Sequence, residues 1–225
     1  MMRALAAKEL RATWRNRAFR VALVGYLAAL LTASLTFLAG FLASDDSQFA
    51  ATNALLFSRL VGFQWVVLAA MTPWLVLQLH GRELGDASLL SITGLMAPPW
   101  QVLFVKAAAS ALCALLLLSL SVPLLTLVWR MGVADGSQIA WSFLDTLLFL
   151  LVLIVLTLQV RLMCRSWVAS WLGSYLALGV LGLSWREMAS LLDHRSVTMI
   201  VGLLVLLCGT ALLAFADRSM AYERD

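Results

Sequence analysis

VLFVKAAASALCALLLLSLSVPLLTLVW, residues Val102 to Trp129, is the longest of the apolar stretches in this sequence. Its only charged residue is Lys106, about one turn from the start. An α-helix rises about 1.5 Å per residue, so about 20 apolar residues cross the hydrocarbon core of a bilayer. The stretch therefore predicts a membrane-spanning helix that is long enough to tilt or to project beyond the bilayer.

Five further apolar stretches lie around it, and each is long enough to span a membrane as a helix. They are Val21–Leu42, Leu60–Leu79, Ile139–Val160, Trp167–Leu183 and Val197–Phe215. The composition agrees, since 63% of the residues are hydrophobic and only 12% are charged, whereas a soluble domain carries about 25% charged residues. We therefore expect an all-α, polytopic membrane protein, with six transmembrane helices in one domain over residues 1–225. The length leaves no room for an additional soluble catalytic domain.

The distribution of lysine and arginine predicts the orientation, because these residues concentrate on the cytoplasmic side of membrane proteins. With the first residues inside, twelve of the sixteen basic residues fall in cytoplasmic segments or at their borders. The four that fall outside are Arg59, Arg130, Arg186 and Arg195. This bias predicts a bacterial inner-membrane protein with both termini in the cytoplasm.

The segment Met1–Phe19 predicts an amphipathic helix that precedes the first span. Apolar residues recur at helical spacing on one side and basic residues gather on another. Such a helix suits the cytoplasmic headgroup layer. The residues that define it are Lys8, Glu9, Arg11, Trp14 and Arg15. The alternative is a plain anchor that follows the charge bias and binds no partner.

The connection between the second and third stretches has a helical pattern of its own. Acidic residues lie near its start, where they suit the helix dipole, and leucines could form an apolar face. Gly94 and Pro98-Pro99 end the pattern. The residues concerned are Arg82, Glu83, Leu84, Asp86, Leu89, Leu90 and Leu95. We expect Lys106, one turn into the next span, to extend its ammonium group to the membrane surface.

These features resemble the permeases of type-2 ABC exporters. Such permeases have a basic amphipathic first helix with a Lys-Glu-Leu element, and a cytoplasmic loop patterned Arg-Glu-x-Gly-Thr-Leu-x-x-Leu, followed by Pro and Lys. The matching residues here are Lys8-Glu9-Leu10, Arg82-Glu83-Leu84-Gly85-Asp86-Ala87-Ser88-Leu89-Leu90, Pro98 and Lys106. The Gly-Thr-Leu element is stretched in this chain to Gly85-Asp86-Ala87-Ser88-Leu89.

The resemblance implies a non-catalytic transmembrane subunit that forms a translocation pathway as a dimer. The partner would be a second copy or a homologous permease. The loop from Arg82 to Leu95 would be a coupling helix that docks on two separate ATPase subunits. ATP and Mg would bind to those partners, because this chain has no Gly-x-x-x-x-Gly-Lys-Ser/Thr motif. A loop that merely lies at the membrane surface is the alternative.

Two further groups of residues are candidates for function. Asp145, in the fourth stretch, is an intramembrane carboxylate, and Gln159 returns to nearly the same helix face. They could line a pathway or join helices, although Asp145 could also sit at the outer interface. The permease resemblance implies a re-entrant outer segment between the fifth and sixth spans, at Glu187, Met188 and Leu191. An ordinary external loop is the alternative there.

Other functions remain open. A membrane channel or an assembly scaffold without an ATPase is one alternative. The haem-exporter permease of cytochrome c maturation is another, because Gly85-Asp86-Ala87-Ser88-Leu89 loosely echoes its Asp-Gly-Ser-Leu loop. An intramembrane enzyme would need paired catalytic groups at one depth, and we expect none. His80 and His194 fall on opposite predicted sides, so no metal site is expected, and nothing indicates nucleic-acid binding.

Overall fold

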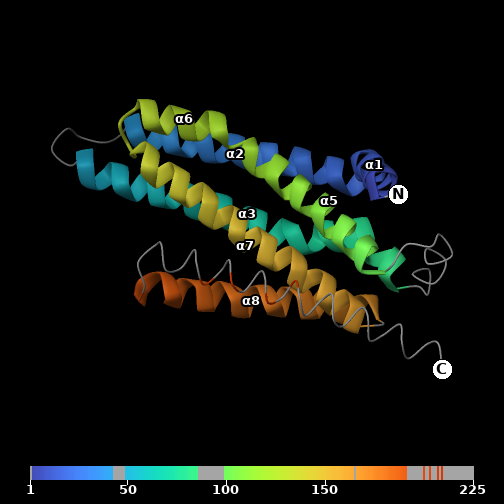
Figure 1. Cartoon of the computed structure of the whole chain (residues 1–225). Helices are drawn as coiled ribbons and strands as arrows, with labels where there is room; N and C mark the ends of the chain where they lie inside the picture. The colour runs from blue at the N-terminus through green and yellow to red at the C-terminus, as the bar shows by residue number, and fades with distance from the viewer. Residues whose placement is uncertain are drawn as a thin grey trace, which may run out of the picture.

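The computed structural model describes residues 2–42, 49–85, 99–164 and 166–191, with single positions at 200, 203, 207 and 209. Within these ranges the fold is all-α, as expected. The helices are α1 (Met2–Arg15), α2 (Arg17–Leu42), α3 (Phe49–Gly85), α5 (Pro99–Ser119), α6 (Val122–Arg130), α7 (Gly136–Met163) and α8 (Trp167–Leu191). Figure 1 shows them as a bundle of long helices, with α1 at one end.

Five segments among the described residues are long and apolar enough to cross a membrane. They are Arg17–Leu42, Leu55–Gly81, Gln101–Arg130, Gly136–Met163 and Trp167–Ser184. The chain is therefore a multi-pass membrane protein, and five of the six predicted spans have a helical counterpart. The sixth, Val197–Phe215, lies almost wholly outside the described residues.

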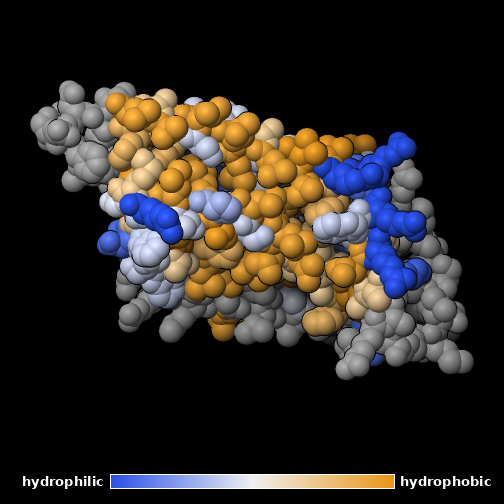
Figure 2. All heavy atoms as spheres, turned by 90° about the horizontal axis from the view of Figure 1, so that it is seen from above, coloured by the Kyte–Doolittle hydropathy of each residue, from blue (hydrophilic) through white to orange (hydrophobic). Residues whose placement is uncertain are grey.

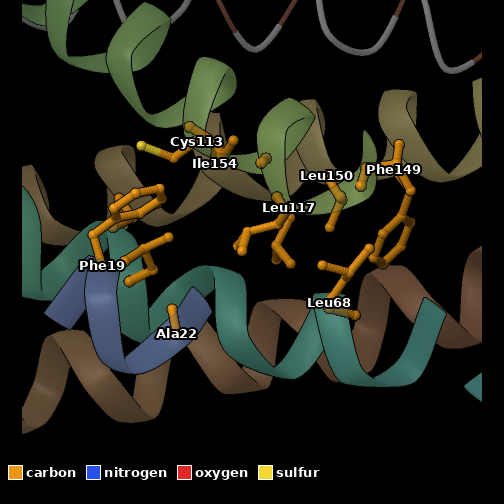
Figure 3. Close-up of a cluster of buried hydrophobic side chains, with 14 of the residues drawn as sticks. Phe19, Ala22, Leu68, Cys113, Leu117, Phe149, Leu150 and Ile154 are labelled. Carbon is orange, nitrogen blue, oxygen red and sulfur yellow. The ribbon is translucent and has the colours of Figure 1, made fainter. Parts of the chain in front are cut away.

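The core lies where α2, α3, α5 and α7 meet. Figure 3 shows Phe19 and Ala22 of α2 at one end of this cluster and Leu68 of α3 and Phe149 of α7 at the other, with Leu117 of α5 between them. Phe149 also packs on Trp65, with the ring centroids 4.4 Å apart. Helix α8 packs on α7 and α3, so it covers one side of this core. The long apolar stretches thus bury one face against each other.

The outer surface of the bundle is also apolar. Large aliphatic side chains are exposed at helical spacing along α2 and along α8, where Val168, Leu172 and Leu176 are each at least 65% exposed. Figure 2 shows hydrophobic residues in a broad band across one face, with hydrophilic residues toward its two ends. A surface of this kind suits lipid, because the hydrocarbon core offers no hydrogen-bonding partners.

The third predicted span is not one continuous helix. Helix α5 ends at Ser119 and α6 begins at Val122, with a turn between them. Pro123 follows at the start of α6. Its backbone nitrogen has no hydrogen to donate to the carbonyl four residues earlier, and in a continuous helix its ring would clash with that carbonyl. The Ser121 hydroxyl donates to Leu118 O at 2.7 Å and accepts from Gln64 Nε2 at 2.8 Å. The predicted span over Val102–Trp129 is confirmed as one apolar segment, Gln101–Arg130, but it consists of two helices with a turn between them.

The first helix is shorter than predicted. It ends at Arg15, and α2 begins at Arg17, so the predicted segment Met1–Phe19 is divided. Asn16 causes the division, because its Oδ1 accepts a hydrogen bond of 2.8 Å from the backbone N–H of Ala18. A side chain that bonds in this way caps the start of a helix. Phe19 consequently belongs to the core of the bundle.

Candidate functional site: a buried polar cluster at one end of the bundle

A buried ion pair joins α1 to α5. The Lys106 ammonium donates to Glu9 Oε1 at 3.2 Å. The Lys106 side chain is wholly buried and that of Glu9 is 12% exposed. The expectation that Lys106 reaches the membrane surface was therefore wrong. Glu9 instead meets the ammonium group inside the bundle, which offsets the cost of taking both charges out of water.

His80 of α3 lies beside this pair. Its Nε2 forms a hydrogen bond of 3.1 Å with the hydroxyl of Ser110, one turn beyond Lys106 on α5. Its Nδ1 is 3.9 Å from Glu9 Oε2, which is too far for a hydrogen bond but close enough for an electrostatic contact. The Glu9 carboxylate therefore lies between the ammonium and the imidazole. We call these four residues the Glu9 cluster, and they hold α1, α3 and α5 together.

Arg161 joins the same end of α3 to α7 and α8. Its Nε donates to the carbonyl of Gly81 at 2.7 Å, directly after His80. Its Nη1 donates to the carbonyl of Cys164 at 3.2 Å and to the hydroxyl of Ser170 at 3.0 Å. The guanidinium also lies 5.4 Å from the ring centroid of Trp167, in range of a cation–π attraction. One buried arginine thus holds three helices together.

Gly81 is needed for this arrangement. A Cβ at this position would collide with the six-membered ring of Trp167. The absence of a side chain lets Trp167 approach the backbone of α3, where Arg161 binds the carbonyl. Gly81 was not singled out in the sequence, because a glycine near a helix end has no distinctive pattern.

The first three predicted coupling residues follow directly after Gly81 in α3. The backbone of Arg82, Glu83 and Leu84 forms the last turn of α3, and Leu84 is buried. The side chains of Arg82 and Glu83 are outside the described part of the structure. Asp86, Leu89, Leu90 and Leu95 also lie outside the described residues. The connection begins after Gly85 and ends at Pro99, so its two stems are α3 and α5.

The structure separates Glu9 from the other residues of the predicted interfacial helix. Glu9 and Thr13 are buried against the bundle. Leu10 and Trp14 are 46% and 62% exposed, so the apolar side faces outward. The basic residues are exposed as well, and they are Lys8, Arg11 and Arg15. Glu9 thus turns away from the other residues of the predicted interfacial helix.

Asp145 and Gln159 both lie on α7 and are partly buried. They are about 21 Å apart along the helix, given a rise of about 1.5 Å per residue. Phe149 and Val152 lie between them on nearly the same face and belong to the apolar core. The two polar residues therefore do not form a continuous stripe, and a pathway role for either stays a prediction.

Glu187, Met188 and Leu191 lie in the last part of α8, which continues beyond the predicted end of the fifth span at Leu183. Their side chains are not among those described, and neither are residues 192–199. A re-entrant segment here stays a prediction. No group of three metal-ligating side chains occurs in the part of the chain that the structure describes.

The sequence missed the Glu9 cluster as a unit. Its only signal was that His80 follows one apolar stretch and Lys106 lies within another, while Glu9 is the single carboxylate of the basic first segment. Such residues are costly in a membrane unless they are paired, and that cost could have prompted a search for partners among the three.

Comparison with known proteins adds no relative, since no protein-family model, curated protein or solved structure matches this chain.

Proposed function

We propose that this chain is the transmembrane subunit of an ATP-driven exporter of the type-2 ABC class. Two copies, or one copy and a homologous permease, would form the translocation pathway. Two separate ATPase subunits would bind ATP and Mg and dock on the connection from Arg82 to Leu95. The chain itself would hydrolyse nothing. The multi-pass helical fold and the motif resemblance support this proposal.

The main support for this proposal comes from the hydrogen bonds that hold α3 and α5, the two helices on either side of that connection. The α5 stem is tied to α1 through Lys106 and Glu9. The α3 stem is tied to α7 through Gly81 and Arg161, and His80 adds a contact to α5. Hydrogen bonds with a charged donor, as from Lys106 and Arg161, are strong in a site with little water. A displacement of the connection would therefore move four helices together instead of bending one loop.

This arrangement suits a subunit that receives force from outside the membrane. ATP-driven closure of the ATPases would push the connection, and the two buried contacts would pass the movement to α1, α5 and α7. The relative tilt of these helices would then change the side on which the pathway opens.

The experiment is co-purification of the tagged chain with an ABC ATPase encoded beside its gene. The expected result is a stable complex whose ATP hydrolysis in proteoliposomes depends on this chain. A charge-reversed variant, Glu9→Lys with Lys106→Glu, tests whether the cluster is needed for coupling. The reversed pair should restore more ATPase activity than either single reversal. A chain that assembles fully without any ATPase would point to a channel or a scaffold and would overturn the proposal.

A further inference from the structure

A groove runs along the exposed side of α1. The described residues that line it are Ala7, Lys8, Arg11, Ala12 and Arg15, and its volume is about 510 Å³. The three basic residues follow one another at spacings of three and four, so they share one helix face. The two alanines on either side have short side chains, which leaves room beside the cations.

The charge of this groove is not cancelled by α1 itself. Glu9 is the only carboxylate in that helix, and it is buried against Lys106. Arg11 is two positions further on, which is about 200° of rotation around the helix axis. The ion pair with Lys106 therefore holds the one negative charge of α1 on the far side of the helix from the groove. The face that remains carries three positive charges.

Apolar side chains border the same groove. Leu10 and Trp14 lie on the next face of α1 and are exposed, and Trp14 packs on Phe19 with ring centroids 5.6 Å apart. Figure 2 shows hydrophilic residues gathered at the end of the bundle where α1 lies, at the border of the hydrophobic band. Cations next to exposed apolar side chains at the edge of that band match an anionic headgroup above acyl chains.

We propose that this groove binds the phosphate headgroup of an anionic phospholipid. Lys8, Arg11 and Arg15 contact the phosphate, and Leu10 and Trp14 lie against the acyl chains. Arginine suits this role because its guanidinium can donate two parallel hydrogen bonds to one phosphate. The proposal does not depend on an exporter function, since it rests only on α1 and on the membrane location.

The test uses the full-length purified protein in zwitterionic detergent. Phosphatidylglycerol or phosphatidylcholine is added, and bound lipid is measured by native mass spectrometry. We expect tighter retention of phosphatidylglycerol, weakened by added salt because salt screens exposed charges. The test variant is Arg11→Gln with Arg15→Gln. The matched control is Arg59→Gln with Arg130→Gln, which also removes two exposed arginines, from other helices.

Each basic residue near an anionic surface accounts for roughly a fivefold change in affinity. The test variant should therefore lose roughly 25-fold in phosphatidylglycerol affinity, while the control variant stays close to wild type. The variant Arg11→Lys with Arg15→Lys keeps both charges and should retain most of the binding. An equal loss in the test and control variants would overturn the proposal.

Two further arms separate the possible ligands. Inorganic phosphate alone should compete weakly, because it has no acyl chains. If it competes fully, the groove is a site for free phosphate and not for lipid. If the test variant loses ATPase association but keeps its phosphatidylglycerol affinity, the groove is a protein contact. Should the test variant fail to fold, equal affinity of the wild type for the two lipids would refute the proposal by itself.

Discussion

Glu9 and Lys106 are 97 positions apart in the sequence, yet their side chains form a hydrogen-bonded ion pair of 3.2 Å inside the bundle. The pair fixes α1 against α5, and the imidazole of His80 lies on the other side of the same carboxylate. The ion pair therefore attaches α1, which was predicted to lie in the headgroup layer, to the membrane-spanning core.

Removing the ammonium should destabilise the protein strongly. Lys106→Met leaves Glu9 buried without its cation, and breaking a buried pair in this way costs about 3 to 5 kcal/mol. Changing both residues, Glu9→Leu with Lys106→Met, should cost less than Lys106→Met alone, because no charge is then left unpaired. Unfolding in detergent, followed by circular dichroism, measures the difference. Arg59→Met removes an exposed basic residue from another helix and is the control. If the free energy of unfolding of Lys106→Met equals that of this control, the pair does not stabilise the fold.

Gly81 should be intolerant of any side chain. Gly81→Ala places a methyl group against Trp167, and overpacking of this kind costs about 1 to 3 kcal/mol. Gly62→Ala, in the same helix, meets nothing within 4 Å and should leave the stability unchanged or slightly higher. Melting temperatures of the two variants in one detergent provide the comparison. Equal melting temperatures would show that Trp167 moves aside at little cost.

Cysteine labelling should report the orientation. In a chain whose three cysteines are replaced by serine, new cysteines at Ser47 and Ser137 should react with an impermeant maleimide added to intact cells. A cysteine at Ser88 should react only after the membrane is opened. The reason is the bias of lysine and arginine toward one side. Labelling of position 88 in intact cells would reverse the orientation and contradict the docking of an ATPase there.

Changes in the predicted coupling loop should uncouple the complex without preventing insertion. Glu83→Lys reverses a charge, and Leu90→Asp removes a leucine from the predicted apolar face of the loop, which would need a covering partner. Each variant should reach the membrane at the wild-type level, but less ATPase should co-purify with it. Ser137→Lys is a control, because it adds a charge to the exposed start of α7. Full ATPase association and full transport in both loop variants would rule out this loop as the coupling element.

Asp145→Leu should reduce transport if the carboxylate faces a polar pathway or a partner helix. Gln159→Leu, on the same helix, tests the second polar position independently. Insertion should be normal in both, because each change removes a polar group from an apolar helix. Uptake into inverted vesicles, corrected for protein amount, measures transport. Wild-type uptake by Asp145→Leu would mean that the carboxylate serves only as an interfacial residue.

The spans could be predicted because backbone groups in a bilayer must be satisfied within the helix, so length and hydropathy suffice. The Glu9 cluster could not, because a count of lysine and arginine treats each charge separately, and pairing depends on which helices pack. The interruption of the helix after Ser119 could not be predicted from the sequence either. Pro73 lies inside the continuous helix α3, whereas Pro123 begins α6 after a turn, and a proline alone does not distinguish the two cases. The hydrogen bond that Ser121 accepts at this break comes from Gln64 on another helix, so this stretch of sequence alone does not reveal it.

The bend between α5 and α6 also bears on the order in which the protein assembles. The hydrogen bond from Gln64 to Ser121 joins two separate spans, so it forms only after both have entered the bilayer and met. Until then the turn at Leu120 and Ser121 keeps only its local bonds, the Ser121 hydroxyl to Leu118 among them. We therefore expect the angle between α5 and α6 to be loosely set at insertion. Contact with α3 would then fix it, which makes the final shape of this span a late event in the biogenesis of the protein.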